Sequence, residues 1–168
     1  MSPRSDCFTI EGARFSKSAP EVATPVSVKR IVLWRAEVPN QPGVLAATLK
    51  PLAEAGVNLT VVMGYRFPGE PSKAAIEVFP VKGKKAEAAA QAAGLAALEM
   101  PTLLIEGDDR PGLGHAIAQA IADAGINLAF LVTQVIGKKY SSVIAFENED
   151  DLKKAASLIK KVKPARSK

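Results

Sequence analysis

Two corners of this chain, each following an apolar run and opening a helical pattern, carry the groups that bind a small zwitterion. Main-chain N–H groups at a helix start lack intrahelical acceptors and favour a carboxylate. Glycine lets the backbone approach a ligand, and side-chain oxygens accept hydrogen bonds from an ammonium group. Together these groups match a free α-amino acid. The candidate ligand-binding residues are Asn40, Gln41, Gly43, Val44 and Leu45 in the first corner, Asp108, Asp109, Gly112, Leu113, Gly114 and His115 in the second, and Asn58 and Asn127 behind the two helices.

A structural alternative stays open for each corner. Pro-Gly can simply start a helix, with Asn40 or Asp109 as its cap. Asn58 and Asn127 follow helix-ending glycines, where an asparagine more often ties down a neighbouring loop than contacts a ligand. His115 lies in a first helical turn that disfavours its protonated form, and it can equally be a plain surface histidine.

Most signatures of catalysis are absent from the sequence. One histidine and one cysteine cannot make a zinc site. Neither a nucleophile elbow nor a phosphate loop occurs, and the dinucleotide pattern that starts at Gly112 fails at Ile117. We therefore predict a protein that is not an enzyme, with no catalytic residue, no metal and no cofactor.

The two corners belong to a repeat of 69 residues. Without a gap, nine residues between Glu37 and Leu59 are identical to those 69 positions later. A repeat of this length is a small domain, and two such domains are individually marginal, so we expect them to share an interface.

Hydrophobic periodicity gives each copy the order β-α-β-β-α-β, which is the ferredoxin-like arrangement. We predict the fold class α+β, with two such units packed together and two helices behind each sheet. The expected strands are 31–38, 57–65, 74–79, 103–105, 126–136 and 141–146, a short segment is expected at 95–100, and the helices are 42–55, 84–93, 111–124 and one that starts at an Asn148 cap. Pro51 should kink the first helix. The predicted division is an arm at 1–28, a first domain at 29–100 and a second domain at 101–168.

The second copy has hardly enough residues after its last helix for a final strand. That strand is missing, short or supplied by another segment. The alternating residues Cys7–Ile10 are our candidate to fill the place, because an unpaired sheet edge invites aggregation.

The motif Pro-Gly-Val-Leu, followed by Leu-x-x-Ala-Gly-Val-Asn-Leu, resembles the ACT domain, an amino-acid-sensing module of regulated metabolic enzymes. The resemblance covers residues 29–162 in two copies. It implies that Asn40, Gly43, Val44 and Leu45 serve the ligand. The second copy departs from the family pattern at Asp109 and Gly114, which implies an altered, differently selective or vestigial site.

The resemblance implies a stand-alone regulator that binds a small amino acid and acts on a metabolic enzyme, and a homodimer is the default assembly. A single cysteine indicates a reducing compartment, and neither a signal peptide nor a membrane span is evident, so we expect a cytoplasmic protein. The alternatives are a nucleic-acid-associated regulator using the lysine-rich C-terminus and a module acting mainly in assembly. Nucleic acid is the weaker alternative, because no aromatic interleaving or recognition helix accompanies the lysines.

Overall fold

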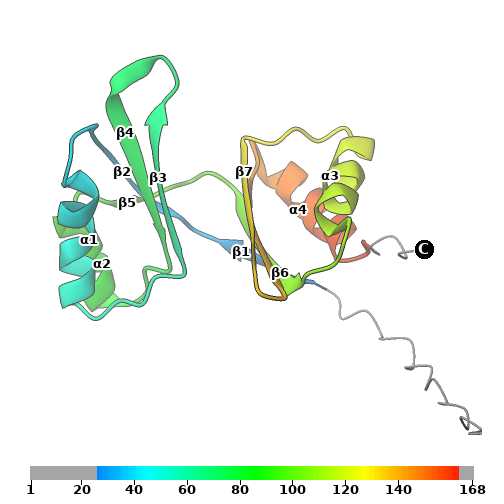
Figure 1. Ribbon diagram of the computed structural model, residues 1–168, viewed down its shortest axis with the longest axis horizontal. Coiled ribbons are helices and arrows are strands. Elements are labelled where there is room, and N and C mark those ends of the chain that lie inside the picture. The colour runs from blue at the N-terminus through cyan, green and yellow to red at the C-terminus, as the bar shows by residue number, and fades with distance from the viewer. Residues whose placement is uncertain (1–25, 163–168) are drawn as a thin grey trace, which may run out of the picture.

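The computed structural model describes residues 26–162 as two α+β units. Each unit contains a four-stranded antiparallel sheet with two helices on its outer side, and the two sheets lie between the helix pairs (Figure 1). The ferredoxin-like prediction is confirmed.

The first sheet has the order β3-β4-β2-β5. The elements of this unit are β2 (Trp34–Pro39), α1 (Val44–Glu54), β3 (Val61–Phe67), β4 (Glu70–Phe79), α2 (Lys84–Ala92) and β5 (Ala96–Ala97). Helix α1 runs on through Pro51. Only two residues of the predicted 95–100 segment form a strand.

The second sheet has the order β1-β6-β8-β7. Its elements are β1 (Ser27–Ile31), β6 (Thr102–Asp108), α3 (Leu113–Asp123), β7 (Phe130–Ile136), β8 (Lys139–Ala145) and α4 (Glu149–Ile159). Strand β7 begins later than predicted, because the residues after Gly125 form the loop that leads out of α3.

Strand β1 occupies the place of the final strand that the second copy lacks. It pairs antiparallel with β6, from Ser27 opposite Glu106 to Ile31 opposite Thr102. The prediction that another segment supplies this strand is confirmed, but the segment adjacent to β6 is Ser27–Ile31. The candidate segment 7–10 lies outside the described residues.

The predicted strand 31–38 was also wrong at its start. Ile31 ends β1 in one sheet, and Trp34 begins β2 in the other. The chain crosses between the two sheets at Val32 and Leu33, within a continuous apolar run.

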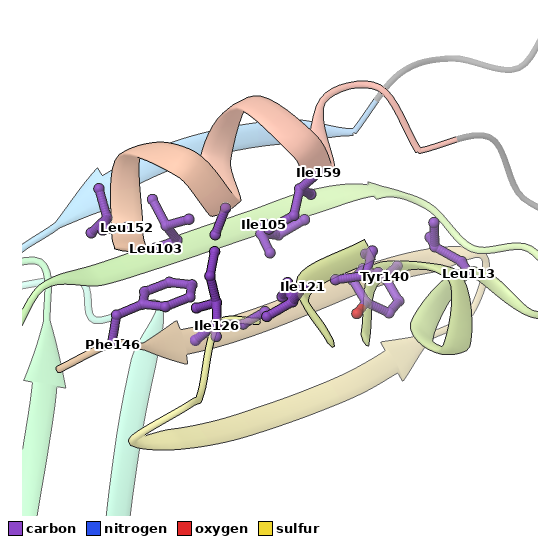
Figure 2. Packing of buried hydrophobic residues seen from close by; sticks show 12 residues of the cluster. Leu103, Ile105, Leu113, Ile121, Ile126, Tyr140, Phe146, Leu152 and Ile159 are labelled. Carbon is purple, nitrogen blue, oxygen red and sulfur yellow. The ribbon is translucent and has the colours of Figure 1, made fainter. Parts of the chain in front are cut away.

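The core of the second unit illustrates why its elements form. In Figure 2, Leu152 and Ile159 of α4 point toward Leu103 and Ile105 of β6. These four side chains are almost fully buried, as helical spacing of three and four on α4 and alternation on β6 require. Asn148 caps α4 as predicted, since its side chain accepts a hydrogen bond from the Asp151 N–H at 2.9 Å.

A third apolar cluster joins the helix-free faces of the two sheets. Ile31 and Leu33 of the crossing segment are buried there with Leu104 and Val143 of the second unit. Partly buried residues of both units pack around them, among them Met63 and Phe130. The two units therefore share an apolar interface, and the segment that crosses between the sheets lies within it.

No helix within residues 26–162 combines the length and the apolar character needed to cross a membrane.

We predict that removing β1 destabilises the second unit. A chain that begins at Val32 loses Val28 from the second core and Ile31 from the shared cluster. At about 1.5–3 kcal/mol for a fully buried aliphatic side chain and less for the half-buried Val28, the free energy of unfolding should fall by roughly 2–4 kcal/mol. Urea denaturation followed by circular dichroism measures this fall. The control is a chain that begins at Val26 and keeps β1. Equal stability of the two truncated chains would contradict the proposed role of β1.

Candidate functional site

The first corner, residues 39–45, links β2 to α1 through a left-handed glycine. Gly43 has φ +88°, a conformation that side chains rarely adopt. The N–H of Val44 donates to the Gln41 carbonyl, and the N–H of Ala47 donates to that of Gly43. Within residues 26–162, the N–H groups of Leu45 and Ala46 make no backbone hydrogen bond. These two donors are therefore open to an anionic group, as the helix start predicts.

Asn40 ties this corner to the start of β4. Its N–H donates to the Ser72 carbonyl at 2.8 Å, and its side-chain Nδ2 donates to the Pro71 carbonyl at 2.9 Å. Asn40 is not the cap of α1, because that position belongs to Gly43 and carries no side-chain cap. No hydrogen bond to Asn40 Oδ1 forms within the described residues, so this oxygen is oriented by its own amide and remains an available acceptor.

The second corner, residues 108–115, repeats the backbone geometry. Gly112 has φ +81°, and Leu113 N–H donates to the Arg110 carbonyl as Val44 does to Gln41. Asp109 N–H donates to the Lys138 carbonyl at 2.8 Å. Within the range 26–162, the N–H groups of Gly114 and His115 form no backbone hydrogen bond.

The side chains of the second corner differ from those of the first. Asp108 forms an ion pair with Lys139 at 2.5 Å. On α1, Leu45 is 45% exposed, and its equivalent in the second corner is Gly114, which has no side chain. The neighbouring Leu113 is buried in the core. The second corner therefore presents more acidic charge and less apolar surface than the first.

The two corners lie at opposite ends of the molecule (Figure 1). The second corner follows β6 beyond the residue that pairs with Ser27, and the first follows β2 at Pro39. Strands β1 and β2 are both extended, so at about 3.3 Å per residue this stretch spans on the order of 40 Å. One amino acid cannot contact both corners.

Asn58 and Asn127 follow the C-terminal ends of α1 and α3, away from the open N–H groups at the starts of these helices. Both are exposed, and neither side chain makes a hydrogen bond within the described residues, so the prediction that they tie down a loop finds no support. Asn58 borders a shallow hollow of about 270 Å³ that also contacts Lys82 and Lys85. His115 is exposed on α3.

A charge cluster around the buried Glu77, on the helix-free face of the first sheet, was missed at the sequence level. Glu77 Oε1 accepts hydrogen bonds from Arg35 Nε at 2.7 Å and from Tyr65 OH at 2.8 Å, and Arg35 Nη2 donates to Tyr65 OH at 3.0 Å. The sequence did contain a signal: Glu77 is the one charged residue in the apolar stretch 74–79.

The cluster shifts the ionisation of its members. Burial, helped by the hydrogen bond to Glu77, raises the pKa of Tyr65 to about 12. Burial lowers the pKa of Arg35, but the hydrogen bond and the charge of Glu77 outweigh it and leave that pKa raised.

Comparison with known proteins places this geometry in a family. Residues 101–164 match the ACT domain. No curated protein sequence matches the chain. The matched residues span the second unit, and the first unit has the same fold.

Solved structures share the whole two-unit arrangement. Protein BT0572 from Bacteroides thetaiotaomicron has a TM-score of 0.61 at 16% identity, over 82% of this chain and 99% of that one. The regulatory subunit of aspartate kinase from Thermus thermophilus, in a ligand-free form, has a TM-score of 0.57 at 19% identity, over 84% and 99%. Its counterpart from Thermus flavus has a TM-score of 0.53 at 21% identity, over 83% and 97%. At these identities the likeness shows the fold.

Two glycines provide a matched test of the corner geometry. Gly43→Ala should lower the free energy of unfolding by about 1–2 kcal/mol, because alanine is strained at positive φ. Gly114→Ala should raise it by about 0.5–1 kcal/mol, since Gly114 lies in a helix with open space around it. Urea denaturation measures both changes. The same sign for the two variants would contradict the assigned geometry.

The pKa of Tyr65 predicts a pH dependence of stability. The folded pKa of about 12 lies above the ordinary value of 10.0, so the stability that this shift contributes is present below pH 10 and lost as pH rises through 12. Between pH 9 and 11.5, Tyr65→Phe should therefore lose less stability than the unmodified chain in urea denaturation. Parallel losses in the two proteins would contradict the shift.

Proposed function

We propose that this tandem ACT-domain chain is a non-catalytic sensor that binds a free amino acid at the first corner and regulates a metabolic enzyme. The observation that carries the proposal is the set of open groups at that corner. Two N–H donors of Leu45 and Ala46 lie at a helix start, Gly43 leaves the backbone accessible, and Asn40 Oδ1 is held nearby in the same loop.

These groups suit the two charged ends of an amino acid. The carboxylate would accept from the Leu45 and Ala46 N–H groups, where the helix dipole adds partial positive charge. The ammonium would donate to Asn40 Oδ1. The exposed Leu45 side chain offers apolar contact to the ligand.

The second corner is less suited to this ligand. Asp109 replaces Asn40, and a carboxylate there repels the carboxylate of an amino acid while adding attraction for its ammonium. We therefore assign the principal site to the first corner.

A single chain leaves the corner open to solvent, whereas small ligands are usually buried over most of their surface. A second copy of the chain supplies the missing wall in our proposal, which makes the active form a homodimer. The edge strand β3 supports this arrangement, since Val62 exposes apolar surface on it.

The target is proposed from the structural neighbours. Two of them are described as regulatory subunits of aspartate kinase. By analogy, this chain would act on a separate biosynthetic enzyme in the cytoplasm, and no catalytic residue set within residues 26–162 argues for a reaction of its own.

Calorimetric titration with the twenty common amino acids tests this function. One ligand should bind below millimolar concentration, and Asn40→Ala should weaken it by about 1–3 kcal/mol, because a buried polar group loses its partner. Asp109→Ala, the equivalent change in the second corner, is the control and should leave the affinity unchanged. If no amino acid binds, or if only Asp109→Ala weakens binding, the assignment is wrong.

A further inference from the structure

The cluster of Arg35, Tyr65 and Glu77 lies outside the corner and has no role in the proposed ligand contacts. Glu77 is completely buried, and the side chain of Arg35 is 20% exposed. Both donors contact the same carboxylate oxygen, Oε1. The other oxygen, Oε2, is buried without a hydrogen-bond partner. This carboxylate is therefore held in an incompletely satisfied state, which ordinarily costs stability.

The cluster is next to the interface between the two units. Ile76 and Val78 belong to the helix-backed core, so the alternating Glu77 faces the helix-free side. In the sheet, Glu77 is directly opposite Arg35 on β2 and Met63 on β3. Met63 packs against the apolar cluster shared by the two units. The charged row thus borders the surface on which the second unit packs.

The second unit provides an internal comparison for this row. Leu104 on β6 is equivalent to Arg35, Val143 on β8 to Glu77, and Val132 on β7 to Met63. These residues pair across the strands in the same way. Leu104 and Val143 are buried in the shared cluster. At the position equivalent to Tyr65 the second unit has Gln134. The fold therefore accommodates an apolar pair where the first unit has an ion pair.

The ion pair of the first unit and the apolar pair of the second are expected to differ in what they contribute: the apolar pair to stability, the ion pair to the choice of packing surface. Replacing a buried ion pair by well-packed apolar residues is often neutral or stabilising, whereas removing one partner is strongly destabilising. An ion pair with an unsatisfied oxygen is a poor source of stability compared with Leu and Val. Its physical effect is to interrupt an apolar face that would otherwise resemble that of the second unit.

We propose that Arg35, Tyr65 and Glu77 are positioning residues that fix which surface of the first unit the second unit packs against. With an apolar row there, the helix-free face of the first unit offers a larger apolar area with no preferred register. The charged row prevents sliding across it and prevents the equivalent face of another copy from packing in its place, because either move would bury the exposed parts of Arg35 and Tyr65 against apolar side chains.

The test transplants the second unit's residues into the first, as Arg35→Leu/Tyr65→Gln/Glu77→Val. Spin labels at Ala53→Cys on α1 and Ser157→Cys on α4, both exposed, report the distance between the units by double electron–electron resonance, with Cys7→Ser in every protein. The unmodified row should give one narrow distance distribution. The triple variant should give a broad distance distribution or one with several maxima, or it should change its oligomeric state on gel filtration. Its Tm should be equal to or above that of the unmodified protein.

Glu77→Gln and Arg35→Leu alone are the matched controls. Glu77→Gln leaves the Arg35 charge without its counter-ion, and Arg35→Leu leaves the buried Glu77 charge without one, so Tm should fall by about 10 °C in each variant. A transplanted protein that keeps the single narrow distribution would overturn the proposal. So would a transplanted protein that unfolds at as low a temperature as the single variants, because the cluster would then serve stability. Neither result depends on a ligand, so failure here is distinct from failure of the proposed function.

Discussion

The rest of the structure depends on one pairing: β1, which precedes the first unit in the sequence, joins the sheet of the second unit. The stretch from Ser27 to Pro39 belongs to two sheets: its first half pairs with β6 and its second half with β4. Without β1, β6 would become an unprotected edge in a unit that lacks a final strand of its own. The first unit is held by the same stretch, because Ile31 and Leu33 are buried where the two sheets meet. Two marginal halves thus become one structure through a strand that precedes the first unit in the sequence and completes the sheet of the second.

That pairing also determines where ligands can bind. Because β1 and β2 run in succession through opposite sheets, each strand-to-helix corner is carried to an outer end of the pair. Neither corner faces the other unit, so the shared interface cannot enclose an amino acid at Gly43 or Gly112. Within residues 26–162 nothing covers either corner, so in the proposed function a second copy of the chain closes the site, which links ligand binding to assembly. Under the proposed function, occupancy of the first corner would be transmitted through the contacts of a dimer and through the strand that connects the two sheets.

Local elements were predictable from the sequence, and their assignment to sheets was not. Pro-Gly starts, helix-ending glycines and the Asn148 cap are short-range signals, and the four helices appear where these signals place them. Periodicity cannot tell which sheet a strand joins, so the run around Ile31 was read as one strand and its first half was not separated. The corner residues were identified correctly as a loop, but the role of Asn40 as a tie to Pro71 needed the position of β4, a long-range contact.

The charge cluster shows how two copies of one fold come to differ. Duplicated units begin with the same helix-free face, and two identical apolar faces can pack in several ways that are close in free energy. Placing Arg35 and Glu77 in one copy, with Leu104 and Val143 in the other, makes the two faces unequal while the sheet register stays the same. The cost is a carboxylate oxygen without a partner. The apolar row in the second unit shows that the fold does not require an unpartnered carboxylate oxygen at this position. The charges are explained by the proposal that they favour one packing of the two units over other packings.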